Sequence, residues 1–521
     1  MSKFRNSKES VSSNLMLWSD LSTQVGIKET YDMKIWPVNS VFNDGPISFN
    51  IPQQARALLE DIMIVTKLRL KKNGLLLGER QKDVSVVNNF ANSLWGHVDI
   101  QFDDRVDITQ SMKNAYAYQT YFNNILNSDS RREDVLLYNE IFKMDEGKTK
   151  AIEEKTRIFW SWNKELDESI KSMMADTVTN KDQVLEEVKE LLWNFNWGLT
   201  EKNLTGIANK LGTWNGDEHV DKCDQVREIV DKAWLKSTIN IGASDRSERI
   251  NTGKSIEVES KLHHPIISTS KCLPNNIRIR VKLTLNTDAF LLLSENEGYS
   301  IDIEQCYLRA SYVEPHDAFL KQIEKRIQIQ PVPYFVSKPE IIVKPITSVG
   351  RFIRIHDIFP NKLPSHAFFC LQKSQDFEGS FRKNPFTFIP FQSFQFYING
   401  SPYFNNHLEV EIINVLGGGD YEYKEFGQLL RQLYKVAGVE LKGNCLINSK
   451  NFALNFITAL SFGADRRNIK ENHLNIDEKA STSLEIDMGI NELPEDIILI
   501  IYAQYNQQIQ IDHLRRVSVI E

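Results

Sequence analysis

Two glycine-containing stretches are the first candidates for chemistry, because glycine-rich loops can cradle phosphate groups. Residues 252–255 (TGKS) end like a phosphate-binding loop, but the position of the required first glycine holds Glu248, and no buried apolar strand comes before it. Residues 417–419 (GGG) lead into an acidic and aromatic stretch rather than a helix that could bind a dinucleotide, so we interpret them as a turn. The sequence also lacks the Gly-x-Ser-x-Gly nucleophile elbow of hydrolases.

Histidine and carboxylate groupings are the next candidates, for metal binding or acid–base catalysis. His263-His264 would point to opposite faces of a strand. His407 shares one strand face with Glu409 and Glu411, but a facial metal triad needs a second histidine. Asp103-Asp104 lies in a turn-like stretch, where such residues are usually solvated. We therefore expect no catalytic residues, no metal site and no cofactor, and predict that the protein is not an enzyme.

The composition is that of a folded protein with more than one domain. The chain has 521 residues, which is long for one hydrophobic core. Its formal net charge of −7 argues against a surface that coats nucleic acid, and we expect no sequence-specific nucleic-acid binding. We also expect neither a signal peptide nor a transmembrane helix. A disulfide framework is not expected, because the cysteines are odd in number and widely spaced: Cys223, Cys272, Cys306, Cys370 and Cys445.

The elements that would position any site are mostly short strands. Residues 1–30 form a polar, serine-rich N-terminal arm, and strand signals separated by turn residues follow up to about residue 122. The alternation at 62–70 becomes polar on one face in its second half, as in an edge or surface strand. Strand signals return at 276–294 and continue from about 298 to the C-terminus. We predict two sandwiches, spanning residues 31–297 and 298–521.

A helical block interrupts the first sandwich. Residues 131–236 have helical periodicity, for example Val184, Val188, Leu191 and Leu192, and are rich in Glu and Lys. The block contains six of the nine tryptophans, and these indicate either a small core of its own or an interaction module: Trp160, Trp162, Trp193, Trp197, Trp214 and Trp234. We interpret the block as an insertion between two strands, forming a tower or lid.

Residues 377–400 (FEGSFRKNPFTFIPFQSFQFYING) contain the densest aromatic run. Phe386 and Phe388 are two residues apart, and Phe394, Phe396 and Ile398 repeat this spacing. Because alternate strand residues share a face, we predict one or two strands whose phenylalanines fill a sandwich core. The Asn384-Pro385 pair is interpreted as the turn that aims the first two rings inward.

Two blocks resemble the hexon-type major capsid proteins of Polinton/Maverick elements and adintovirus-like viruses. The first block, at 84–126, carries Asn89, Phe90, Ser93, Leu94, Trp95, Val98, Asp99 and Ile100, followed by Tyr116, Tyr118 and Tyr121. The second block, at 363–400, carries Leu363, Pro364, Gly379, Ser380, Asn384, Pro385, Phe386 and Phe388. The closing stretch from Ile497 onward is similar to the final strand pair of that family.

The resemblance implies an all-β-dominated double jelly roll, with two consecutive sandwiches and an inserted helical subdomain. It also implies a structural major capsid protein of the virion shell, present inside the host cell before assembly. The implied partners are two further copies in a pseudo-hexagonal homotrimer, neighbouring capsomers and penton or minor capsid proteins. The motif residues are implied to be structural.

Two alternatives stay open at the level of sequence. A minor capsid or spike protein is disfavoured by length, because a penton usually needs one sandwich. A carbohydrate-binding or carbohydrate-cleaving jelly roll would need exposed aromatic platforms and, for cleavage, two carboxylates about 5–10 Å apart. The sequence does not show whether a membrane underlies the shell.

Overall fold

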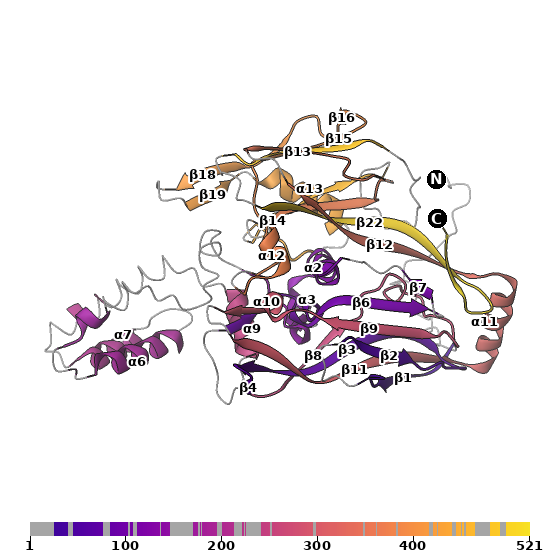
Figure 1. Ribbon diagram of the computed structural model, residues 1–521, viewed down its shortest axis with the longest axis horizontal. Helices are drawn as coiled ribbons and strands as arrows, with labels where there is room; N and C mark the ends of the chain where they lie inside the picture. Colours follow the sequence, from indigo (N-terminus) through magenta and orange to yellow (C-terminus); the bar gives the residue numbers. More distant parts are fainter. Residues whose placement is uncertain are drawn as a thin grey trace, which may run out of the picture.

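The structure is a computed structural model, and it consists mainly of antiparallel strands (Figure 1). It describes residues 26–39, 45–76, 84–102, 105–107, 112–135, 137–145, 170–175, 178, 180–194, 201–212, 221–222, 225, 241–250, 253–294, 298–346, 350–360, 362–381, 384–415, 420–424, 426–439, 444–449, 451–452, 455–463, 480–489 and 496–520. Among these residues, no helix is both long and apolar enough to cross a membrane.

Eight strands in the first part of the chain form two sheets. In chain order they are β1 (Ile27–Ile35), β2 (Ile47–Ile51), β3 (Leu58–Lys72), β6 (Trp95–Phe102), β7 (Arg105–Asp107), β8 (Ile256–Lys261), β9 (Ile279–Leu285) and β11 (Tyr299–Pro315). One sheet has the order β1-β11-β3-β8 and the other β2-β9-β6-β7. Numbered in chain order, these strands follow 1-8-3-6 and 2-7-4-5, which is the arrangement of a jelly roll.

Eight strands in the last part of the chain repeat this arrangement. They are β12 (Val332–Pro345), β13 (Phe352–His356), β14 (His366–Lys373), β15 (Ser393–Ile398), β17 (Leu408–Glu409), β20 (Thr458–Ser461), β21 (Thr482–Asp487) and β22 (Ile497–Ile511). The sheets are β12-β22-β14-β20 and β13-β21-β15-β17, so the order is again 1-8-3-6 and 2-7-4-5. The chain therefore contains two jelly rolls of the same topology, which lie side by side (Figure 1). The predicted fold class is confirmed.

Smaller strands extend this framework. β4 (Leu75–Leu76) pairs with β3, β16 (Ser401–Pro402) with β15 and β23 (Val517–Ile520) with β22. Two further pairs join β5 (Val84–Val86) to β10 (Leu292–Ser294), and β18 (Glu411–Val415) to β19 (Asp420–Lys424). The helices are α1 (Phe90–Ser93), α2 (Ala115–Asn127), α3 (Ser130–Val135), η2 (Leu137–Glu140), α6 (Lys181–Asn194), α7 (Glu201–Leu211), α9 (Ile241–Ile250), α10 (Asp288–Leu291), α11 (Asp317–Ile329), α12 (Ser374–Glu378) and α13 (Gly427–Ala437).

The sandwich cores follow from the alternation of side chains along the strands. In β9, Ile279, Val281 and Leu283 are buried, while Arg280 and Lys282 between them are exposed. The second core contains Phe369, whose ring centroid lies 5.5 Å from that of Phe394. Apolar side chains on inward positions thus hold each pair of sheets together by removing their surface from water.

Of the two predicted explanations for the polar face of β3, an edge strand or a surface strand, the edge strand is wrong. β3 is not an edge strand, because β11 and β8 flank it. Arg69 lies 2.6 Å from Glu304, and Lys71 lies 2.7 Å from Asp302, both on β11. The alternating basic residues therefore form cross-strand ion pairs on the outer face of an interior strand.

The predicted boundary between residues 297 and 298 is wrong. β11 pairs with β1 from Ile27 to Ile35 and with β3 along most of its length, so the first jelly roll extends to Pro315. Helix α11 then leads to β12, where the second jelly roll begins (Figure 1). The predicted N-terminal arm is also shorter than residues 1–30, because β1 begins at Ile27; residues 1–25 lie outside the described part.

The helical block lies between β7 and β8, the fifth and sixth strands of the first jelly roll. The helical region is longer than the predicted residues 131–236, because its described helices run from Ala115 to Ile250; α6 and α7 lie at the left of Figure 1, away from both jelly rolls. The same position in the second jelly roll holds β18, β19 and α13. Trp193 belongs to α6, and the other five tryptophans of the block lie outside the described residues.

Candidate functional site at the junction of the jelly rolls

Helix α2 lies between the two jelly rolls and is buried on almost every side (Figure 1). Its N-cap is Asn114, whose backbone N–H donates to the carbonyl of Gly96 at 3.0 Å. The Asn114 side chain donates to the carbonyl of Phe377 in α12 at 2.9 Å. One residue thus fixes the start of α2 against strand β6 of the first jelly roll and against a helix of the second.

Aromatic rings join α2 to the second jelly roll. Tyr121 stacks on Phe386 with ring centroids 4.3 Å apart, and Phe122 stacks on Tyr502 of β22 at 5.0 Å. Tyr118 lies against Phe377 at 4.8 Å and meets Phe386 edge-on at 5.2 Å. Such pairs add about 0.5–1.5 kcal/mol each beyond the burial of their area. The junction is therefore an apolar core in its own right.

The prediction for Phe386 and Phe388 is wrong in part. Both side chains are 2% exposed, but they lie outside the strands, in a loop before β15, and their rings contact α2 rather than the interior of the second sandwich. Phe394 and Phe396 in β15 do contribute to that interior, next to Phe369. The aromatic run therefore divides between the junction and the sandwich core.

Two tyrosine hydroxyls of α2 form hydrogen bonds with residues of the second jelly roll. Tyr118 donates to Gln372 at 2.8 Å, and the carbonyl of Pro385 accepts hydrogen bonds from both Tyr118 and Gln372. Tyr121 donates to the Asn455 side-chain oxygen at 2.6 Å. Burial raises the pKa of Tyr118 and of Tyr121 well above the usual range, so both remain neutral donors.

A buried ion pair links the helical block to the second jelly roll. Arg246 of α9 is fully buried and donates to the Asp145 carboxylate at 2.7 Å and to the Val86 carbonyl at 3.0 Å. The other oxygen of Asp145 accepts a hydrogen bond from the Asn384 amide. Asn384 also accepts from the Phe386 N–H at 3.3 Å, which holds the loop that carries Phe386. Sequence patterns did not identify Arg246, because arginine in a polar helix is normally exposed.

A second buried polar cluster lies under α1 and α2. Glu140 accepts hydrogen bonds from Asn92 at 2.7 Å and from Asn124 at 3.0 Å. The Asn89 side-chain oxygen accepts from the same two amides, and Asn89 adopts a left-handed backbone with a φ of 56°. Burial raises the pKa of Glu140 to about 7, although these two hydrogen bonds act to lower it.

The remaining motif residues lie on both sides of the junction. Phe90, Leu94 and Trp95 are fully buried, whereas Val98 and Asp99 on β6 are partly exposed, with Asp99 2.9 Å from His97. Leu363 and Pro364 precede β14 and lie partly or fully buried.

Gly379 shows why one motif position needs glycine. It has a φ of 100°, and a Cβ there would lie 2.4 Å from the Cα of Phe290 in α10. Next to it, the Phe381 N–H donates to the carbonyl of Ala289 at 3.0 Å. The backbones of the two jelly rolls therefore approach each other closely at this point.

The residues first considered for chemistry do not form a reactive set. His263 and His264 follow β8 rather than lying on a strand, and both line one cavity of about 40 Å³. Burial lowers the pKa of each to about 3, so both are neutral. In residues 407–411 (HLEVE), Glu409 belongs to β17 and Glu411 to β18, and these two strands pair with different partners. Within the described ranges, no three His, Cys, Asp or Glu residues are grouped to hold a metal. Asp103-Asp104, Thr252 and residues 417–419 lie outside those ranges.

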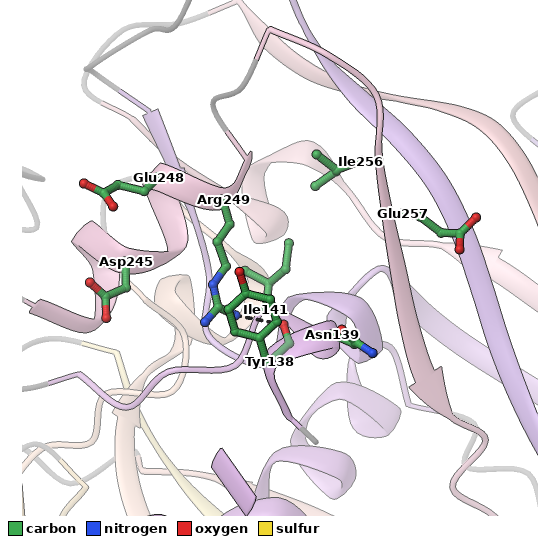
Figure 2. Close-up of a pocket in the computed structure, with 8 residues that line it drawn as sticks. All are labelled: Tyr138, Asn139, Ile141, Asp245, Glu248, Arg249, Ile256 and Glu257. Carbon is green, nitrogen blue, oxygen red and sulfur yellow. Dashed lines mark hydrogen bonds between the residues drawn. The ribbon is translucent and has the colours of Figure 1, made fainter. Parts of the chain in front are cut away.

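A groove of about 570 Å³ lies between η2, α9 and β8 (Figure 2). Figure 2 shows Asp245 and Glu248 on one side, Glu257 on the other and Arg249 over Tyr138 between them. The guanidinium carbon lies 3.5 Å from the ring centroid, and Arg249 donates to the Tyr138 carbonyl at 2.8 Å. The described lining has no serine, cysteine or histidine, and Arg249 is engaged in holding η2 against α9.

No family model matches the chain, and no curated protein matches it in sequence. Solved structures do match. A chain in the cryo-EM structure of the Sputnik virophage has a TM-score of 0.50 and 10% identity, over 99% of this chain and 93% of that one. This comparison agrees with the repeated strand order.

The chain is a double jelly roll.

Two other similar structures are viral major capsid proteins. The Faustovirus major capsid protein has a TM-score of 0.49 and 8% identity, over 95% of this chain and 92% of that one. The crystal structure of the mavirus major capsid protein gives 0.45 and 10% identity, over 100% and 96%.

Proposed function

We propose that this double jelly roll is the structural major capsid protein of an icosahedral virus-like shell, located in the virion. The observation that carries the proposal is the repetition of one jelly-roll strand order twice in a single chain, with α2 and its aromatic contacts fixing the two units side by side. The shared fold with a chain of the Sputnik virophage supports it, as does the resemblance of the two motif blocks to Polinton/Maverick and adintovirus-like capsid proteins.

The proposed assembly is a homotrimer. Three copies of a two-unit subunit present six similar jelly rolls around one axis, which gives a pseudo-hexagonal outline suited to a closed shell. Neighbouring capsomers and penton or minor capsid proteins are the further proposed partners. A subunit with two jelly rolls suits this role better than that of a single-sandwich penton.

Burial of the densest aromatic run counts against its use as a carbohydrate-binding platform. Phe386, Phe388, Phe394 and Phe396 are each at most 2% exposed, so none of them offers a platform to a sugar ring. Their contacts are with α2 or with other core residues.

Light scattering coupled to size exclusion tests the assembly. We expect a particle of three times the 60.2 kDa chain mass, and negative-stain electron microscopy should show hexagonal outlines or closed shells. A monomer at all concentrations, with no assembly in the microscope, would overturn the proposal. A glycan array serves as a parallel assay, in which selective binding would favour the carbohydrate alternative.

We further propose that the distal part of the helical block is a tower or lid that the jelly rolls do not need for folding. α6 and α7 lie away from both sandwiches in Figure 1, whereas Asp145 and α9 contribute to the junction. Replacing residues 150–235 by a short Gly/Ser linker should therefore leave trimer mass and thermal stability nearly unchanged. An insoluble or monomeric product would show that the block belongs to the core or the interface.

A further inference from the structure

Four exposed apolar side chains lie on α11, on β12, on β23 and in the turn between β22 and β23, and we call them the α11-end patch. Ile329 is 84% exposed, Leu514 54%, Phe335 48% and Ile520 42%. These are large fractions for residues that gain stability when removed from water. Figure 1 shows β12 and β22 running out from the second jelly roll to this end, next to α11.

Strand register places part of the patch on one face. Phe335 is opposite Gln508, and Gln508 is opposite Ile520, so the three side chains lie in one row across three strands. The outer two strands of such a row are about 10 Å apart. Arg515 donates to Glu324 of α11 at 2.7 Å and so ties the turn that contains Leu514 to the helix. Within the described residues, β23 pairs with β22 and with no strand on its other edge.

The described part of the N-terminal segment begins beside α11, at the opposite end of this helix from Ile329. The carbonyl of Gly26 accepts a hydrogen bond from the N–H of His316, the N-cap of α11, at 3.1 Å. Residues 15–21 (LMLWSDL) form an apolar run within the otherwise polar arm. An extended chain from Trp18 to Gly26 spans up to about 27 Å, which exceeds the roughly 20 Å length of a helix of 13 residues.

We propose that residues 15–21 dock on the α11-end patch of their own chain. The segment supplies a tryptophan and three leucines, and the patch supplies aliphatic side chains, one phenylalanine and a free strand edge. The length of chain between residues 15–21 and Gly26 is enough to reach the patch within one chain. The contact lies within one subunit, so it goes beyond the proposed function and does not depend on it.

Photo-cross-linking of the full chain tests this contact. Phe335 is replaced by p-benzoylphenylalanine, which a half-exposed site accepts, and the cross-linked peptides are mapped by mass spectrometry after mixing ¹⁴N- and ¹⁵N-labelled chains. We expect adducts between position 335 and residues 15–21 with a single isotope label. The matched control places the same group at Phe352, which is 70% exposed. Its strand, β13, lies away from α11 in Figure 1, so this position should give no such adduct. Adducts of mixed label, or adducts to other segments alone, would overturn the proposal.

A second variant separates docking from folding. The double substitution Leu17→Asp and Trp18→Asp removes two apolar anchors, and the adduct yield should fall about tenfold or more. Ser12→Asp with Ser13→Asp adds the same charge outside the apolar run and should leave the yield unchanged. Because both pairs precede β1 in the sequence, melting temperatures should stay within a few degrees of the parent. An unchanged yield in the Leu17/Trp18 variant would contradict docking through the apolar run.

Discussion

The ring of Tyr121 stacks on the ring of Phe386 at a centroid distance of 4.3 Å and an interplanar angle of 12°, although the two residues come from different jelly rolls. Tyr121 belongs to a helix of the first unit, and Phe386 to the loop before β15 of the second. Because the contact is buried and aromatic, folding of the two units should be coupled rather than independent.

Truncation of Phe386 should therefore destabilise the whole chain. We expect Phe386→Ala to lower the free energy of unfolding by about 3–5 kcal/mol, the usual result of removing a buried phenylalanine. Phe352→Ala is the matched control, and at 70% exposure it should change stability by less than about 0.5 kcal/mol. Denaturant unfolding followed by circular dichroism measures both. Equal effects would show that the Tyr121–Phe386 contact does not stabilise the junction.

A comparison of alanine substitutions at Gly379 and Gly400 isolates the steric effect of the close approach between the two jelly rolls. Both have positive φ, at 100° and 78°, so alanine strains the backbone at either position. Only at Gly379 would the new Cβ meet the Phe290 backbone, whereas nothing lies within 4 Å at Gly400. Gly400→Ala should lower stability by about 1 kcal/mol, and Gly379→Ala by at least about 2 kcal/mol more. Thermal unfolding checks the difference, and equal shifts would exclude a steric role for Phe290.

Loss of Arg246 should be severe because it leaves the Asp145 carboxylate buried without its cation. We expect Arg246→Met to lower the free energy of unfolding by about 3–5 kcal/mol. Arg354→Met is the control, since Arg354 pairs with Glu485 at the surface and its side chain is 66% exposed; it should change stability by no more than about 1 kcal/mol. Adding Asp145→Asn to Arg246→Met should recover part of the loss. A failure to recover would indicate that packing, not charge, explains the effect.

The strands could be predicted where burial alternates along one segment, as in β9 and β3. Their partners could not, because pairing depends on residues far away in sequence. β11 is a strand of 17 residues that begins at Tyr299, directly after the predicted boundary, and nothing local shows that it pairs with β1 and β3 rather than with the strands that come next. A jelly roll places its last strand beside its first, so a domain boundary predicted from the local sequence pattern falls too early in the chain.

From the sequence, the junction residues could be recognised by their types, but their contacts could not be predicted. The two-residue spacing of Phe386 and Phe388 predicted a strand. A loop held by Asn384 can present the same two rings to α2. Arg246 gave no signal, because its burial depends on Asp145 and on the carbonyls of Val86 and Lys143. The pattern of Asn89, Asn92 and Asn124 likewise gave no indication that these amides surround Glu140.

Glu140 should make stability depend on pH. Burial raises the pKa of its carboxyl group from 4.5 in the unfolded chain to about 7 in the folded protein. Between these values the folded state holds a proton that the unfolded state has released, so the contribution of Glu140 to stability is full below pH 4.5 and is lost as the pH rises through 7. At about 1.4 kcal/mol per pH unit, the loss is on the order of 3 kcal/mol.

Glu140→Gln, which stays neutral and can still accept from Asn92 and Asn124, should abolish this fall and raise the melting temperature at pH 8 relative to the parent. The exposed Glu60→Gln change should have no such effect. Melting curves from pH 5 to pH 8 for the three proteins decide the matter, and parallel curves for Glu140→Gln and the parent would show that Glu140 does not titrate in this range.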